Sequence, residues 1–126
     1  MVNNRTIKNF YDLPVWQESR KLVLDIYKIT IKFPKEETYG LISQIRRASM
    51  SVAANIAEGF GRFHYKDKIK FYLQARGSLI EVQNYIFLSQ DLKYIDKEAA
   101  RVIFKKCNDI QFQLNSIIKK NRNINS

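Results

Sequence analysis

The chain has 126 residues and carries 22 lysines and arginines against 12 aspartates and glutamates, a formal net charge of +10. This length predicts a single domain over residues 1–126. The only cysteine, Cys107, excludes an internal disulfide and a cysteine-cluster zinc site, and is typical of a reducing compartment. Residues 1–8 are polar and no apolar run is long enough to span a membrane, so we expect a cytoplasmic protein without membrane contact.

The first two expected helices are bounded by proline and glycine. Apolar residues recur at helical spacing over residues 15–33, and Asp12 is the expected N-cap of this helix. Pro34 ends the segment, because the residue before a proline avoids the α-helical conformation. A second helix is expected over residues 37–60, with acidic residues at its start and Gly61 after its end.

Two longer helices are expected in the second half of the chain. Within residues 66–90, apolar residues repeat every seven positions over 72–86. Within residues 96–120, they follow spacings of three and four over 99–117, the most regular pattern in the sequence.

Short connections between these four segments favour helices that run in opposite directions. The expected fold is therefore all-α, an antiparallel up-down-up-down four-helix bundle. Residues 1–11 and 121–126 are expected to be polar tails.

The second helix carries polar residues where a core is expected. They recur at spacings of three and four on one face, and the third helix offers polar partners opposite them in an antiparallel hairpin. Since a lone buried charge is costly, Arg47 is expected to pair with Glu81. We predict a buried, hydrogen-bonded network that fixes the register of these helices, formed by Gln44, Arg47, Ser51, Asn55, Glu58, Ser78 and Glu81.

A carboxylate-amide active site of Asn55, Glu58 and Glu81 is the alternative interpretation of these residues. The di-iron bundle motif, however, needs a histidine on each of two helices, whereas the single histidine, His64, follows a glycine-containing turn. Cys107 lies in the apolar stripe of the fourth helix, without a neighbouring base in the sequence. Nucleotide-binding, metalloprotease and serine-hydrolase motifs are absent from the sequence. We therefore predict no catalytic residue, metal site or cofactor.

Three blocks of the sequence resemble one protein family. Residues 44–48 read QIRRA, residues 51–61 read SVAANIAEGFG and residues 77–81 read GSLIE. With FYDLPVW at residues 10–16, they resemble the four-helix-bundle proteins encoded in intervening sequences of bacterial 23S ribosomal RNA genes, often called S23-type ribosomal proteins. The resemblance covers residues 10–118.

The resemblance implies a bundle that assembles into a ring-like homopentamer and has no assigned enzymatic activity. It also implies kinship with the accessory variability proteins of diversity-generating retroelements, basic pentameric barrels that bind reverse transcriptase and nucleic acid. The residue pattern itself predicts an oligomer, because the third helix is apolar on more than one face.

Two functions remain open at this stage. The positive charge predicts binding of RNA or DNA through its phosphate backbone, with low sequence specificity because no base-reading motif is visible. The alternative interpretation of the charge is that it only keeps the bundle soluble. The second candidate function is an interaction scaffold for a reverse transcriptase or another genetically linked protein.

One end of the expected bundle collects the first residues, the second connection and the last residues, and it is the more basic end. Arg62, Lys66 and Lys68 are the strongest candidates for phosphate contacts there. The full set expected to contact nucleic acid is Arg5, Lys8, Arg62, Lys66, Lys68, Lys70, Lys119, Lys120 and Arg122.

Overall fold

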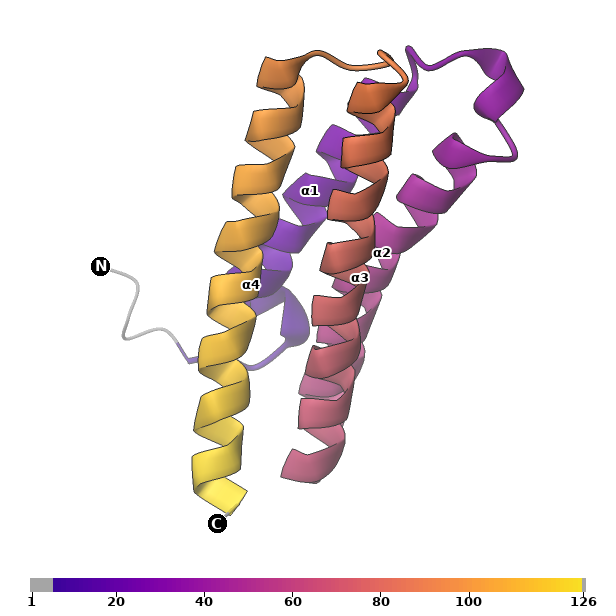
Figure 1. Cartoon of the computed structure of the whole chain (residues 1–126). Coiled ribbons are helices and arrows are strands. Elements are labelled where there is room, and N and C mark those ends of the chain that lie inside the picture. Colours follow the sequence, from indigo (N-terminus) through magenta and orange to yellow (C-terminus); the bar gives the residue numbers. More distant parts are fainter. Residues whose placement is uncertain (1–5, 126) are drawn as a thin grey trace.

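The computed structural model describes residues 6–125, and within that range the chain is all-helical, with four long α-helices and no β-strand (Figure 1). The helices are α1 (Pro14–Thr30), α2 (Leu41–Gly61), α3 (Tyr65–Asp91) and α4 (Lys97–Asn125). Short 3-10 turns at Phe10–Asp12 and Lys35–Glu37 precede α1 and α2. The four expected helices are confirmed, although several of their ends differ from the prediction.

The start of α1 is organised differently from the prediction. Pro14 occupies the first turn, where its missing N–H is not needed. The N-cap is Leu13 rather than Asp12, so the predicted cap is wrong. Asp12 belongs to the preceding 3-10 turn, and its carboxylate accepts the backbone N–H groups of Lys8 (3.2 Å) and Asn9 (3.0 Å) instead.

The connection from α1 to α2 is longer than predicted at both of its ends. α1 stops at Thr30, whose carbonyl accepts the N–H of Phe33 (3.0 Å) in a tighter turn. α2 begins only at Leu41, whose N–H donates to the carboxylate of Glu37 (3.0 Å). The same carboxylate accepts the hydroxyl of Tyr94 (2.9 Å), so it links the start of α2 to the α3–α4 connection.

Both predicted polar tails contain ordered structure. α4 continues through residues 121–125, because no glycine or proline interrupts it and each added residue adds a backbone hydrogen bond. The side-chain amide of Asn121 also donates to the carbonyl of Ile117 (2.8 Å). At the other end of the chain, the ring of Phe10 packs edge-on against Trp16, with 5.1 Å between centroids.

The core lies along the centre of the bundle and takes apolar side chains from all four helices. Cys107 lies within it, and burial raises the pKa of its thiol to about 12, as expected of a small core residue. Other fully buried side chains of this core include Leu22, Ile26, Ile45, Val52, Ile56, Leu79, Ile86, Ile110 and Leu114.

Polar pairs at the surface give the register between α3 and α4. Arg76 donates to Asn115 (2.7 Å), and Gln83 donates to Asn108 (3.0 Å). Residue numbers thus rise along α3 as they fall along α4, and Figure 1 shows the two helices packed lengthwise.

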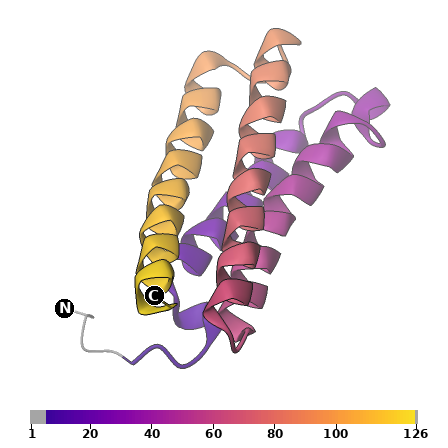
Figure 2. The ribbon, with the colours of Figure 1, turned by 60° about the horizontal axis from the view of Figure 1, so that its bottom comes forward.

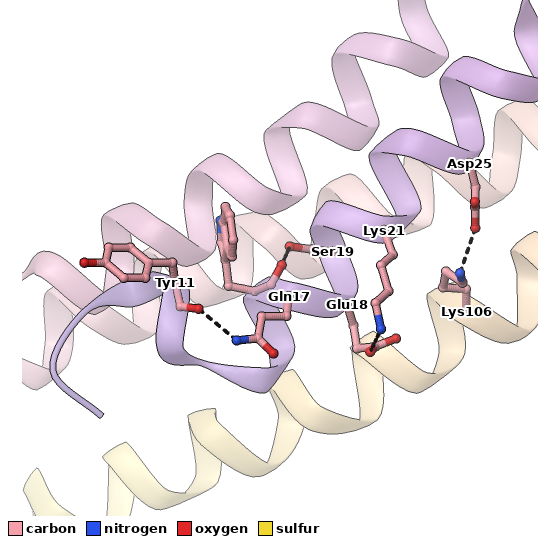
Figure 3. A network of polar contacts seen from close by, with 8 residues as sticks. Tyr11, Gln17, Glu18, Ser19, Lys21, Asp25 and Lys106 are labelled. Carbon is pink, nitrogen blue, oxygen red and sulfur yellow. Dashed lines mark hydrogen bonds and ion pairs between the residues drawn. The ribbon is translucent and has the colours of Figure 1, made fainter. Parts of the chain in front are cut away.

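Figure 3 shows two of the polar contacts that hold α1 against its neighbours. The ammonium of Lys106 on α4 forms a half-buried ion pair with Asp25 on α1, at 2.7 Å. The side-chain amide of Gln17 donates to the carbonyl of Tyr11 (2.9 Å), which holds the preceding 3-10 turn against α1.

Candidate nucleic-acid interface

α2 and α3 approach each other closely where a three-residue connection, residues 62–64, joins them at one end of the bundle (Figure 1). Gly59 is buried in the last turn of α2 because the ring of Tyr72 lies against it. A Cβ at Gly59 would lie only 2.7 Å from Cε1 of that ring, so the site has no room for a side chain. Burial raises the pKa of the Tyr72 hydroxyl to about 12.

Lys68, in the first turn of α3, caps the C-terminal end of α2. Its ammonium donates to the carbonyls of Phe60 (2.6 Å) and Gly59 (3.4 Å) in the last turn of the helix, where carbonyls lack the partners that a continuing helix would supply. The side chain is half-buried, and burial lowers the pKa of the ammonium. A cation in the first turn of a helix is normally disfavoured, and here it is explained by the C-terminus of the neighbouring helix. The sequence predicted Lys68 as a phosphate ligand and missed this structural role.

Arg62 lies at the C-cap of α2 and keeps an accessible guanidinium. It forms an ion pair with Glu58 at 2.7 Å and lies over the ring of Phe71, 4.6 Å from its centroid. The Arg62 and Glu58 side chains are 44% and 53% exposed, so solvent screens their attraction and the pair contributes little to stability. A phosphate approaching from solvent can therefore reach Arg62.

The remaining predicted cations of the described chain are exposed near this end of the bundle. Figure 2 shows the end of α4 beside the α2–α3 connection, with the segment that precedes α1 passing the same end. Among residues 6–124 none of these cations takes part in an ion pair: Lys8, Lys66, Lys70, Lys119, Lys120 and Arg122. Arg5, which was also predicted, lies outside the described residues.

Charge is divided between the two ends of the bundle. The end formed by residues 8–12 before α1, 58–68 around the α2–α3 connection and 119–122 in α4, hereafter the basic end, has seven cations against three carboxylates, an excess of +4. These are Lys8, Arg62, Lys66, Lys68, Lys119, Lys120 and Arg122 against Asp12, Glu58 and Asp67. The opposite end has four cations against five carboxylates, an excess of −1. These are Lys32, Lys35, Lys93 and Lys97 against Glu36, Glu37, Asp91, Asp96 and Glu98.

The predicted polar network between α2 and α3 forms only in part. Ser78 is buried, and its hydroxyl donates to the hydroxyl oxygen of Ser51 (2.9 Å). The side-chain amide of half-buried Asn55 donates to the same oxygen (3.0 Å) and to the Ser51 carbonyl (2.9 Å). The remaining four predicted members are exposed, so the prediction of buried charges is wrong; these are Gln44, Arg47, Glu58 and Glu81.

These four side chains are exposed because the buried face of α2 is shifted by one residue from the face that was predicted. Besides Ser49, α2 buries Ile45, Ala48, Val52, Ile56 and Gly59. Each member of the polar stripe precedes one of these positions, and one residue corresponds to about 100° around a helix. The stripe therefore lies on the outer edge of the contact between α2 and α3.

Arg47 and Glu81 nevertheless reach the same place, as the predicted register requires. Both line a shallow groove between α2 and α3, together with Ser51 and Tyr85. Within the described chain they form no ion pair with each other. The predicted ion pair between Arg47 and Glu81 is thus wrong, whereas the prediction that the two residues lie at the same level of the bundle is correct.

The titratable side chains of residues 6–124 do not assemble a metal centre: no group of three or more histidine, cysteine, aspartate or glutamate side chains is placed to hold an ion. His64 is exposed in the α2–α3 connection, as expected of a turn residue. In the same part of the chain, no helix is long and apolar enough to cross a membrane.

The aromatic tip of the α2–α3 connection was missed by sequence reasoning. Phe63 is 88% exposed, and its only ring partner among the described residues is His64, with centroids 5.0 Å apart. The signal for it was the run of three aromatic residues, 63–65, in a connection too short to turn all of them toward the core.

Comparison with known proteins gives the chain a family. The family model described as 23S rRNA-intervening sequence protein matches residues 11–116. A solved structure, of a protein with unknown function from the S23 ribosomal protein family of Bacteroides thetaiotaomicron VPI-5482, is 26% identical with a TM-score of 0.75. That similarity covers 83% of this chain and 98% of the other. A search of curated proteins gave no match. Since the family model spans most of the sequence, and the solved structure shares the fold, the chain belongs to the 23S rRNA-intervening sequence protein family.

Proposed function

We propose that this protein is a non-enzymatic, basic homo-oligomer, a ring of five antiparallel four-helix bundles, that binds the phosphate backbone of RNA or DNA at its basic end. The observation that carries the proposal is the division of charge, +4 at one end against −1 at the other. Exposed lysines and arginines without carboxylate partners can neutralise the phosphates of a nucleic acid and release the counterions condensed on it. This release supplies most of the affinity of non-specific binding.

Backbone recognition suits the chemistry of this end better than base recognition. Five of its seven cations are lysines, which act as mobile point charges, whereas base reading usually uses side chains that present two fixed hydrogen bonds. Arg62 is partly engaged by Glu58, so its contribution to phosphate binding requires displacement of an exposed and weak ion pair.

Neutralising the basic end should weaken binding to all sequences alike. In the variant Arg62→Gln, Lys66→Gln, Lys120→Gln, each lost phosphate contact should reduce the slope of log K against log salt by about 0.9 for duplex DNA. Fluorescence anisotropy with a labelled duplex and a structured RNA, at several salt concentrations, measures this slope. Lys68 is left unchanged because its ammonium caps the C-terminal end of α2.

The matched control removes the same charge from the opposite end, through Lys32→Gln, Lys35→Gln and Lys97→Gln. Both triple variants have a formal net charge of +7, so only the position of the charge differs. Equal affinities and slopes for the two variants would show that the basic end is not the binding surface.

Apolar side chains on α3 support the oligomer. Ile80 is 55% exposed and Phe87 56% exposed, and they lie on one face because they are two turns apart. Val82 on the same helix is fully buried in the core and does not belong to this exposed face. Exposed apolar side chains in such an arrangement are typical of a surface that meets another chain.

Light scattering at micromolar concentration should therefore give about five times the chain mass of 14.9 kDa. Ile80→Lys should shift this mass toward that of the single chain, because it places a charge in an apolar contact. Ile31→Lys, at a 77% exposed position beyond the end of α1, is the control and should leave the mass unchanged. A parent protein that stays monomeric would rule out the ring.

The same face of α3 supports the second candidate function, a scaffold for a reverse transcriptase or another genetically linked protein. A monomer with Ile80 and Phe87 exposed would favour this candidate, because the face would then require a different partner chain.

A further inference from the structure

We propose that the α2–α3 connection holds an unpaired nucleotide base against the ring of Phe63, with Arg62 and Lys66 on the flanking phosphates. This inference rests on the proposed nucleic-acid binding and specifies the form of nucleic acid that the basic end prefers. Phe63 is the middle residue of the three-residue connection and is 88% exposed. A shallow hollow of about 400 Å³ is lined by Phe63, His64, Tyr65 and Lys66.

Phe63 contributes nothing to the bundle that would explain an aromatic residue at this point. Its ring meets only His64 among the described rings, edge-on at an interplanar angle of 86°. An exposed phenylalanine leaves its faces in water, which is unfavourable unless a ligand covers them. A flat apolar ring in this setting is suited to stacking with another flat ring.

Hydrogen bonds fix the backbone on either side of Phe63. The backbone N–H of Arg62 donates to the carbonyl of Gly59 (3.3 Å), and the N–H of Lys68 donates to the carbonyl of His64 (3.0 Å). The Lys68 ammonium also joins the end of α2 to α3 through the Phe60 carbonyl. A backbone that is already fixed loses little freedom on binding, so more of the stacking energy contributes to affinity.

The charges around the ring identify the partner as a nucleic acid rather than an apolar peptide. Arg62 precedes Phe63 within the connection, Lys66 follows it in the first turn of α3, and both are exposed. Continuing the α3–α4 register from Arg76 and Asn115 by seven residues places Arg122 opposite Ile69, so cations of α4 also reach this end. An aromatic ring surrounded by cations is typical of proteins that bind single strands, where bases stack and phosphates are neutralised.

The proposal requires a single strand, because the faces of bases in a duplex are covered by their neighbours. Phe63→Ala should weaken binding of a labelled single-stranded oligouridylate by about 5- to 150-fold, the range for loss of one stacked base. Binding of a duplex of the same length should change by less than about twofold. Phe63→Tyr should retain the affinity, because the ring is kept.

Phe112→Ala is the matched control, since Phe112 is 73% exposed on α4 and should leave both affinities unchanged. If the parent binds the single strand and Phe63→Ala binds it equally well, the stacking proposal fails while nucleic-acid binding stands. If the parent binds neither probe, the proposed function itself fails. A fall in light-scattering mass for Phe63→Ala without nucleic acid would show that the ring is a subunit contact, which overturns the proposal.

Discussion

Leu22→Ala should lower the free energy of unfolding by about 2–5 kcal/mol, measured by urea denaturation at a fixed protein concentration. Leu22 on α1 is fully buried within the core of the bundle. Truncation removes buried apolar surface and leaves a cavity that helices packed on all sides cannot readily close. Fixing the concentration matters because subunit association would add to the apparent stability.

Leu24, two residues along the same helix, provides the control. It is 55% exposed, so Leu24→Ala should change the free energy of unfolding by no more than about 0.5 kcal/mol. The pair compares the same side chain and the same substitution on opposite faces of α1. Equal losses from both substitutions would contradict the orientation of α1 described above.

Gly59→Ala should also be destabilising, by about 1–3 kcal/mol, although alanine is the better helix former. The added Cβ would lie 2.7 Å from Cε1 of Tyr72 and 3.2 Å from Cβ of Phe71, so the start of α3 would have to shift. That shift would also disturb the Lys68 ammonium, which bonds the Gly59 carbonyl (3.4 Å). Thermal and urea unfolding measure the loss.

Gly61→Ala tests whether the effect is steric. Gly61 also lies in α2, but a Cβ there meets no atom within 4 Å. Alanine should therefore be neutral or stabilise the protein by up to about 1 kcal/mol, because it restricts the unfolded chain. A stabilising Gly59→Ala would show that the two helices lie further apart than the structure places them.

Helix positions could be predicted from the sequence wherever the periodicity was set by the core, whereas helix ends depended on distant contacts. Residues 99–117 have the regular spacing of a core-facing stripe, and α4 covers them. The start of α2 is different, because Glu37 caps it while also accepting the Tyr94 hydroxyl, 57 residues away in the chain. Local spacing contains no information about such a contact.

The polar stripe of α2 shows a second limit of sequence reasoning. Spacings of three and four establish that residues share a face, but they do not establish which face is buried. Ser51 lies at the margin of the core and finds Ser78, whereas Arg47 in the same stripe remains exposed. The distinction depends on how far α2 is rotated about its own axis, which packing against α3 decides.

The candidate site was predictable in its location and not in the role of each cation. The excess of positive charge near Arg62 and Lys66 follows directly from the chain order of a four-helix bundle. The role of Lys68 does not, because it depends on the carbonyls of Phe60 and Gly59 pointing toward α3. The exposure of Phe63 likewise depends on the length of the connection, which has only three residues.

The separation of charge along the bundle changes how a polyanion encounters the protein. α4 has 29 residues, which at 1.5 Å each corresponds to a length of about 44 Å. Electrostatic interactions in physiological salt decay over about 8 Å, so the field of one end has vanished before it reaches the other. The carboxylates near Tyr94 thus cannot offset the attraction at Arg62. An approaching polyanion would therefore be turned toward the basic end before contact, and the proposed association with nucleic acid should be faster at lower salt concentration.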